Sequence, residues 1–356
     1  MKAHRHAALF SLGRPLSPLY ALAMKLRALL YRKGVMKKVK LNVPVISVGN
    51  LTLGGSGKTP LVIYLARLLK KHGFRPAVVS RGYHGASTNP VNIVSDGSSI
   101  LMEAKMAGDE PLMLARTLDD VVVATGKKRA QVCRQVLATY PCDVIILDDG
   151  FQHIGLHRDI DLVLFDVNHF AGNSRVFPGG DLREPITALQ RSSAFVITGV
   201  VDECRDRAKK CRELLRQRLP DKTVFICTPH YSGFAEYRIS SDSVETSRRS
   251  QENVPARLFG FSGIAQPERF YRMAAAAGID LTGRKLFRDH HHYTTEDISN
   301  LHRHAEESGA AGFLTTEKDM VKLTDPVFNT PLPFYVPLLE NLPNEDLDAF
   351  IIERLG

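Results

Sequence analysis

The chain has no acidic residue before Asp96, although residues 1–95 contain 16 of its 47 Lys and Arg residues. After that point the remaining 31 basic residues are outnumbered by the 38 Asp and Glu residues. The formal net charge of +9 therefore arises in the N-terminal quarter of the sequence. Such a segment is attracted to anionic lipid head groups, nucleotide phosphates or nucleic acid, and the charge alone does not distinguish these partners from a merely solvated basic face.

Cysteine is also scarce, and the five cysteines form no CxxC pair and no spacing typical of metal ligands. Their odd number disfavours a closed set of disulfides, which indicates a reducing compartment and core-filling roles. The length of 356 residues exceeds what one hydrophobic core usually holds, about 250 to 300 residues. We expect an N-terminal arm (residues 1–40), a first domain (41–200) and a smaller C-terminal α/β domain (201–356).

The N-terminal arm lacks a hydrophobic run long enough to cross a bilayer. Its longest uncharged stretch, residues 15–24, is about half of the roughly 20 residues that a spanning helix needs. Leucines instead recur at helical spacing among Lys and Arg, which predicts a basic amphipathic helix that can lie in a membrane interface: Leu19, Leu22, Leu26, Leu29 and Leu30. A helix packed on the protein, or a signal peptide ending near Ala23, are the alternative interpretations.

A glycine-rich segment follows an apolar run at residues 43–48 and precedes an amphipathic helix predicted over 58–71. Strand, loop and helix in this order indicate a P-loop, whose backbone amides surround a polyphosphate at the helix N-terminus. The predicted nucleotide-binding residues are Gly54, Gly55, Ser56, Gly57, Lys58 and Thr59. Lys58 would bridge the β- and γ-phosphates, and the Thr59 hydroxyl would bind Mg²⁺. The strict motif has glycine where this chain has Thr52, and no [NT]KxD guanine-reading motif occurs, so we expect ATP.

A second apolar run, residues 142–147, ends at Asp148 and Asp149. A buried parallel strand delivers carboxylates in this way to the edge of the sheet that carries the P-loop. One of the two aspartates would hold Mg²⁺. Adjacent residues of a strand point to opposite faces, so the division of roles between them depends on where the strand ends.

Other candidates are scattered along the chain. Asp109 precedes an apolar helix and is either an N-cap or a catalytic carboxylate. Arg81 and Arg129 can neutralise phosphate charge. A histidine of the run 290–292, beside Asp289, suits the orientation of a carboxylate base better than it suits zinc, because consecutive residues seldom coordinate one tetrahedral ion.

Eight motifs then occur in one order along nearly the whole chain: PVISVGNLTLGGSGKTP, SRGY, GDEP, DDGFQH, LREP, GFSGIAQPERF, DHH and TTEKD. With these motifs the sequence resembles the tetraacyldisaccharide 4'-kinase family, the lipid A 4'-kinases of Gram-negative bacteria. The resemblance implies transfer of the ATP γ-phosphate to the 4'-hydroxyl of a tetraacylated disaccharide 1-phosphate. It also implies Mg²⁺ and attachment to the cytoplasmic face of the inner membrane through the N-terminal helix.

Carried onto matching positions, the resemblance makes Asp109 the general base and His290 its orienting partner, with His291 and His292 as neighbouring alternatives. It places further residues near the site without assigning their contacts: Arg81, Arg129, Gln152, His153 and Glu184. The segment GNSRVFPGGDLREP departs from the family's more usual GNGxxLPAGPLREP, which affects that loop but not Arg183-Glu184-Pro185 at its end.

The sequence thus predicts an α/β fold: a P-loop NTPase-like parallel-sheet domain, a second α/β domain that closes over the site, and the N-terminal amphipathic helix. We expect neither a nucleic-acid partner nor an obligate protein partner, since no nucleic-acid-reading module is recognisable. The alternative function is a membrane-associated P-loop ATPase switch that acts on a protein partner, which would hydrolyse ATP without a lipid acceptor.

Overall fold

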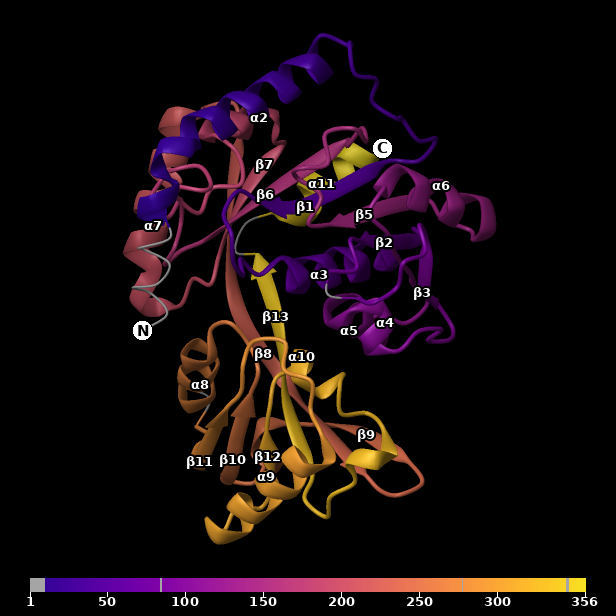
Figure 1. Cartoon of the computed structure of the whole chain (residues 1–356), viewed down its shortest axis with the longest axis vertical. Coiled ribbons are helices and arrows are strands. Elements are labelled where there is room, and N and C mark those ends of the chain that lie inside the picture. Colours follow the sequence, from indigo (N-terminus) through magenta and orange to yellow (C-terminus); the bar gives the residue numbers. More distant parts are fainter. Residues whose placement is uncertain (1–9, 84, 277, 344–345) are drawn as a thin grey trace.

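The computed structural model describes residues 10–83, 85–276, 278–343 and 346–356. Its strands form one continuous sheet in the order β11-β10-β12-β13-β8-β7-β6-β1-β5-β2-β4-β3, with β9 paired to β8. Figure 1 shows an upper half that carries the earlier strands and a lower half that carries the later ones, joined by β8 and β13. The α/β fold predicted from the sequence is confirmed.

The upper half is a parallel sheet whose strands are almost entirely buried, since helices cover both faces. Its edge strand β3 runs antiparallel to β4. The strands of this half are β1 (Val45–Asn50), β2 (Pro76–Ser80), β3 (Asn92–Asp96), β4 (Val122–Thr125), β5 (Val144–Asp148), β6 (Ile160–Asp166) and β7 (Ala194–Thr198). Its helices are α3 (Lys58–Lys71), α4 (Ala104–Ala107), α5 (Asp109–Thr117), α6 (Arg129–Thr139) and α7 (Arg205–Arg218).

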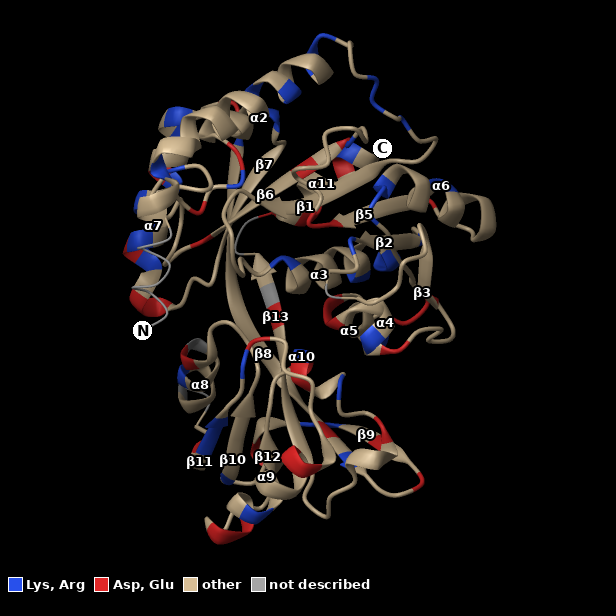
Figure 2. Ribbon diagram, viewed as in Figure 1, with Lys and Arg blue, Asp and Glu red and all other residues tan. Residues whose placement is uncertain are grey.

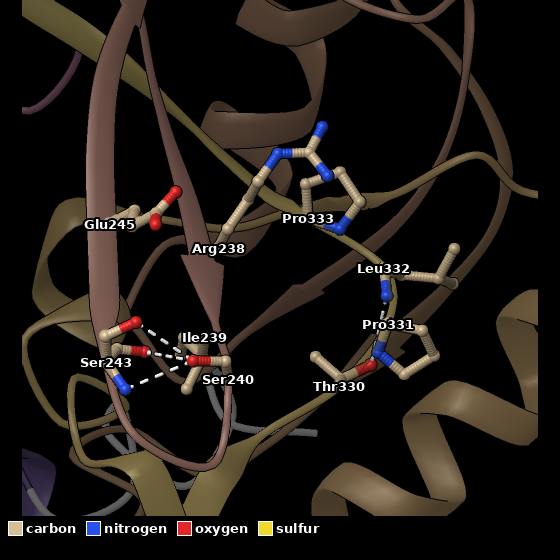
Figure 3. Close-up of a pocket in the computed structure, with 9 residues that line it drawn as sticks. All are labelled: Arg238, Ile239, Ser240, Ser243, Glu245, Thr330, Pro331, Leu332 and Pro333. Atoms are coloured by element: carbon tan, nitrogen blue, oxygen red, sulfur yellow. Dashed lines mark hydrogen bonds between the residues drawn. The ribbon is translucent and has the colours of Figure 1, made fainter.

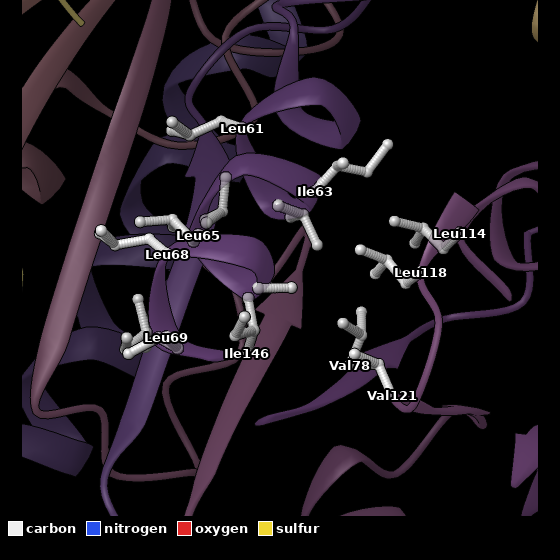
Figure 4. Close-up of a cluster of buried hydrophobic side chains, with 14 of the residues drawn as sticks. Leu61, Ile63, Leu65, Leu68, Leu69, Val78, Leu114, Leu118, Val121 and Ile146 are labelled. Carbon is white, nitrogen blue, oxygen red and sulfur yellow. The ribbon is translucent and has the colours of Figure 1, made fainter. Parts of the chain in front are cut away.

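Alternating strand residues build a separate core on each face of this sheet. On one face α3 packs against β5 and β2, and Figure 4 shows Leu69 of α3 near Ile146, and Val78 beside Val121. On the opposite face α6 packs on β2 and β4, and its Val132 and Val136 join the core on that side. The predicted helix over residues 58–71 is confirmed, and the predicted strands at 43–48 and 142–147 are found within two residues as β1 and β5.

Two long strands, β8 (Thr223–Ile239) and β13 (Phe334–Pro343), connect the halves. The first residues of β8 pair in parallel with β7, and its remainder pairs antiparallel with β13. The other elements of the lower half are β9 (Val244–Arg249), β10 (Arg257–Ser262), α8 (Pro267–Ala276), β11 (Asp280–Leu286), α9 (Thr295–Glu307), β12 (Phe313–Leu314) and α10 (Glu317–Met320). Short 3-10 turns cover 14–16, 186–191, 202–204, 251–253 and 326–328.

The last helix, α11 (Leu347–Leu355), returns to the upper half, where Leu347 and Ile351 join the core beside α3. The Tyr64 hydroxyl of α3 donates a 2.5 Å hydrogen bond to Asp348. Helix α7 also follows residue 200, yet it packs on β7 and β8, and its Ala208 and Leu215 join the core there. The division into domains at residue 200, and the closing movement, stay predictions.

The predicted N-terminal helix is present as α2 (Ser17–Arg32), which runs along the outside of the upper half (Figure 1). It is anchored by polar contacts: the Ser17 hydroxyl donates to the Val176 carbonyl, and the Tyr20 hydroxyl donates to the Arg183 carbonyl. Residues 1–9 of the predicted arm lie outside the described residues. Within the described parts of the chain, each helix is too short or too polar to cross a bilayer.

The packing predicts a sharp contrast between two leucines. Leu65 in α3 is fully buried, whereas the Leu19 side chain in α2 is 67% exposed. Leu65→Ala should lower the free energy of unfolding by about 2 to 5 kcal/mol, since it deletes buried methyl groups and leaves a cavity. Leu19→Ala should change it by no more than about 0.5 kcal/mol. Urea unfolding midpoints of both variants test this, and equal shifts would contradict the assignment of the core.

Candidate active site

The P-loop lies at the carboxyl edge of the sheet, between β1 and α3. Gly54 and Gly57 adopt positive φ values of 109° and 74°, which a residue with a Cβ adopts only at a cost. Gly57 is the N-cap of α3. The Leu53 amide donates a 2.7 Å hydrogen bond to the Asp181 carbonyl, so the segment before Arg183 supports the loop from behind. The loop therefore has the backbone shape that a polyphosphate site requires.

Lys58 points back toward the end of β1 and the end of β5. Its ammonium donates to the Asn50 side-chain oxygen at 3.2 Å and lies 3.5 Å from Asp149 Oδ1. The guanidinium of Arg183 binds the same carboxylate at 2.7 Å, and the Gln152 side-chain amide donates to the Asn50 carbonyl at 2.9 Å. Asp149 is thus shared by two cations at the phosphate-binding edge.

The two adjacent aspartates differ because β5 ends between them. Asp148 is the last residue of the strand, whereas Asp149 has left it with a φ of 56°. Burial, and next the charge of Glu110, raise the pKa of Asp148 to about 7. Burial also acts to raise the pKa of Asp149, but Lys58 and Arg183 outweigh it, so the net shift is downward. The structure therefore distinguishes the two side chains, which the sequence alone left open.

The surroundings of Asp148 fit a hard cation. Among the described residues, Asp148 Oδ1 and the Ser56 hydroxyl are buried without a hydrogen-bond partner, and Thr59, three positions after Ser56, is also buried. The described residues contain no group of three or more His, Cys, Asp or Glu side chains placed to coordinate one metal ion. Mg²⁺ commonly uses one or two carboxylates together with the phosphates of its nucleotide, so a sparse oxygen set suits it.

Asp109 and His290 meet although they are 181 positions apart in the chain: His290 Nδ1 lies 2.9 Å from Asp109 Oδ2. Gly108, not Asp109, is the N-cap of α5, so the N-cap interpretation of Asp109 is wrong. His290 has a φ of 58°, and its amide donates to the Gly263 carbonyl. His291 instead contacts Asp297 at 3.0 Å, so His290 is the histidine whose geometry matches the predicted pairing.

Arg129 and His153 adjoin each other near the ends of β4 and β5. Arg129 is buried, and burial lowers the pKa of its guanidinium to about 10. Its backbone amide donates to His153 Nε2 at 3.3 Å. Burial, followed by the charge of Arg129, lowers the pKa of His153 to about 4. Arg81 follows β2 at the same edge and is exposed, with its guanidinium 6.0 Å from the centroid of the Tyr83 ring.

Glu184 is occupied by another side chain. Its two carboxylate oxygens accept hydrogen bonds from Arg191 at 2.8 and 2.9 Å, and Arg191 stacks on the Phe151 ring at 3.8 Å. A bidentate, buried pair of this kind holds the backbone that leads into Arg183. The geometry therefore gives Glu184 a supporting contact, while its predicted place near substrate is not tested.

The lower half supplies two lysines, Lys318 and Lys322, that the sequence analysis did not assign. Lys318 pairs with Glu110, and Lys322 lies 3.2 Å from Asp109. Burial acts to raise the pKa of Glu110, but Lys318 outweighs it and the net shift is downward. Arg183 was likewise quoted only as part of a motif. The TTEKD motif contains Lys318 and the LREP motif contains Arg183, whereas Lys322 lies outside both motifs, and only the fold shows which side chains these residues contact.

A cavity of about 280 Å³ lies at the far end of the lower half, between the β8–β9 turn and residues 330–333. Figure 3 shows the hydrogen bonds of Ser240 and Ser243 at its edge and the Arg238 side chain beside Pro333. Its lining residues are Arg238, Ile239, Ser240, Ser243, Glu245, Thr330, Pro331, Leu332 and Pro333. None of these lining residues is a candidate site residue, so the cavity is separate from the candidate active site at the edge that carries the P-loop.

The depressed pKa of His153 predicts a specific response to acid. Between about pH 6.5 and 4 the unfolded chain binds a proton at this histidine that the folded chain does not. His153 therefore opposes folding as the pH falls through this window, and its ring should remain neutral at pH 5. NMR titration of the ring Cε1–H, assigned with His153→Gln, measures this, and a midpoint above pH 6 would contradict it.

Comparison with known proteins agrees with this arrangement. A model of the tetraacyldisaccharide-1-P 4'-kinase family matches residues 9–355. A tetraacyldisaccharide 4'-kinase of Desulfotalea psychrophila is 46% identical over 345 residues, covering 97% of this chain and 96% of that protein. One of Syntrophus aciditrophicus is 39% identical over 352 residues, covering 94% and 93%. The crystal structure of LpxK from Aquifex aeolicus in complex with ATP has a TM-score of 0.75 at 29% identity, covering 96% and 98%. The chain belongs to the tetraacyldisaccharide 4'-kinase family.

Proposed function

We propose that this protein transfers the γ-phosphate of ATP to the 4'-hydroxyl of a tetraacyldisaccharide 1-phosphate in lipid A biosynthesis. The observation that carries the proposal is the 2.9 Å contact between Asp109 and His290. It joins a carboxylate from the P-loop half to a histidine from the other half, in a chain whose relatives bear the name of this activity.

The roles of the residues follow from their positions. The P-loop amides and Lys58 bind the phosphates of ATP. Thr59, Asp148 and Asp149 are the residues that would hold Mg²⁺, and when bound this ion neutralises phosphate charge. The ATP complex of the Aquifex aeolicus relative supports the nucleotide. Arg183, which already contacts Asp149 at 2.7 Å, can add positive charge at the same place.

Asp109 acts as the general base. The acceptor 4'-oxygen forms a bond to the γ-phosphorus, the bond from that phosphorus to the bridging oxygen breaks, and ADP leaves with the electron pair. The proton of the 4'-hydroxyl passes to the carboxylate of Asp109. His290 binds Oδ2 of that carboxylate, so Oδ1 is the oxygen that can receive the proton.

Helix α2 attaches the protein to a membrane surface, where an acylated substrate resides. Three of its leucines are exposed at helical spacing, Leu19 (67%), Leu22 (62%) and Leu26 (53%). Leu16, just before the helix, is 60% exposed, whereas Leu29 and Leu30 are half-buried. Lys and Arg positions, and no Asp or Glu positions, occur along the ribbon of α2 and the segment after it (Figure 2). Exposed leucines beside Lys and Arg suit the interface of an anionic bilayer. We place the protein at the cytoplasmic face of the inner membrane, where ATP is available.

The reaction is tested by transfer of labelled γ-phosphate from Mg·ATP to tetraacyldisaccharide 1-phosphate in mixed detergent micelles. Asp109→Asn should lower kcat by about 100-fold or more, because general-base catalysis contributes roughly 10²- to 10⁴-fold. Asp206→Asn, at a 92% exposed side chain, is the matched control and should behave as the parent. ATP hydrolysis by the parent without a phosphorylated lipid would replace this proposal with the ATPase switch.

Membrane attachment is tested by flotation with vesicles that contain anionic phospholipid. The double change Leu19→Asp and Leu22→Asp should reduce the vesicle-bound fraction at least about tenfold, since burial of each leucine contributes roughly 1.5 to 3 kcal/mol. Leu286→Asp, at an exposed leucine of β11, is the control and should bind as the parent. Unchanged flotation of the double variant would remove α2 as the attachment site.

A further inference from the structure

Lys322 is a buried lysine that lies between two carboxylates from different halves of the molecule. Its ammonium is 3.2 Å from Asp109 Oδ2 and 3.5 Å from Asp319 Oδ1. The side chains of Lys322 and Asp109 are only 6% and 9% exposed. Burial of a charged group is costly unless the group is paired. The two carboxylates therefore replace the water that the Lys322 ammonium loses on burial.

One side of the contact is firmly anchored. Asp319 is fully buried and accepts hydrogen bonds from the Gly263 amide at 3.0 Å and the Thr316 hydroxyl at 2.6 Å. The Lys322 ammonium also lies 5.8 Å from the centroid of the Tyr293 ring. Asp319 and Tyr293 therefore hold the ammonium within the lower half. The distance from the ammonium to Asp109 consequently depends on where the lower half lies.

The other side is the carboxylate that the proposed reaction uses. Lys322 and His290 both approach Oδ2 of Asp109, at 3.2 and 2.9 Å. Two donors on one oxygen fix the rotation of the carboxylate and direct Oδ1 away from them. A lysine offers an ammonium with three N–H donors, whereas a histidine ring offers one or two N–H donors in a plane. The two partners are therefore not equivalent.

Asp109 is also held by the contacts around it that cross between the halves. Glu110, the next residue of α5, pairs with Lys318, and Thr117 at the end of α5 donates to Glu317 at 2.7 Å. Lys318 and Lys322 are four positions apart on either side of the end of α10. The same short segment of the lower half thus contacts both acidic residues at the start of α5.

We propose that Lys322 is a positioning residue for phosphoryl transfer. Its ammonium binds Asp109 Oδ2 so that Oδ1 faces the acceptor hydroxyl, and it couples that orientation to the placement of the lower half against the P-loop half. The inference rests on the proposed function, because it concerns the base of that reaction. A merely structural lysine would neutralise Asp319 and have no effect that passes through Asp109.

The kinetic test uses full-length Lys322→Met, which removes the charge and keeps the length of the side chain. We expect kcat to fall about 10- to 100-fold, as small misplacements of a catalytic group do, while KM for Mg·ATP and for the lipid acceptor stays within about threefold. Lys322→Arg should recover most of the lost kcat. Lys285→Met, at an exposed lysine of β11, should match the parent.

A double variant separates positioning from structure. In an Asp109→Asn background, Lys322→Met should lower kcat by less than about threefold further, because the group that it orients is already gone. Multiplied losses in the double variant, an unchanged kcat in folded Lys322→Met, or a raised KM with normal kcat would each overturn the inference. If Lys322→Met does not fold, Lys322→Gln is measured by the same criteria. Absence of lipid phosphorylation by the parent would instead overturn the proposed function.

Discussion

A carboxylate buried between the two halves of the sheet is the constraint on which the rest of this structure depends. Asp109 begins α5 in the P-loop half, yet its contacts His290 and Lys322 come from the other half. Without such partners a buried charge would be unstable in the folded chain. The two halves must therefore be placed against each other with an accuracy that hydrogen bonds require, and the shared strands β8 and β13 provide that continuity.

Charged residues from distant segments of the chain meet at the carboxyl edge of the sheet. The N-terminal quarter contributes Lys58, and later segments contribute Asp148, Asp149 and Arg183. Because the strands are parallel, all of their carboxyl ends meet at this edge. Opposite charges that lie far apart in sequence therefore neutralise one another in space and leave a site suited to a nucleotide and its cation.

Helix α2 combines two properties that an ordinary packed helix does not combine. Polar contacts from Ser17, Tyr20 and Arg27 attach it to the loops behind the P-loop. Its Leu19, Leu22 and Leu26 remain exposed. The sequence permitted either packing on the protein or contact with a membrane, and the structure shows a helix that is attached to the protein and keeps three leucines exposed. If α2 binds lipid, the membrane surface is therefore close to the loops that contain Asp149 and Arg183.

The sequence by itself determined the local elements: the P-loop between β1 and α3, the strand ending at Asp148, and the amphipathic α2. These follow from hydrophobic period, glycine placement and helix spacing, which are properties of neighbouring residues. Through motif resemblance the sequence also indicated that Asp109 and His290 belong together. Only the tertiary structure decided that β5 ends between the two aspartates, that Glu184 binds Arg191, and that Lys318 and Lys322 reach α5. The contacts of Lys318 and Lys322 join residues more than 200 positions apart, which no local pattern encodes. The end of β5 and the choice of Arg191 as the partner of Glu184 depend on how the chain leaves the sheet, which the folded backbone decides.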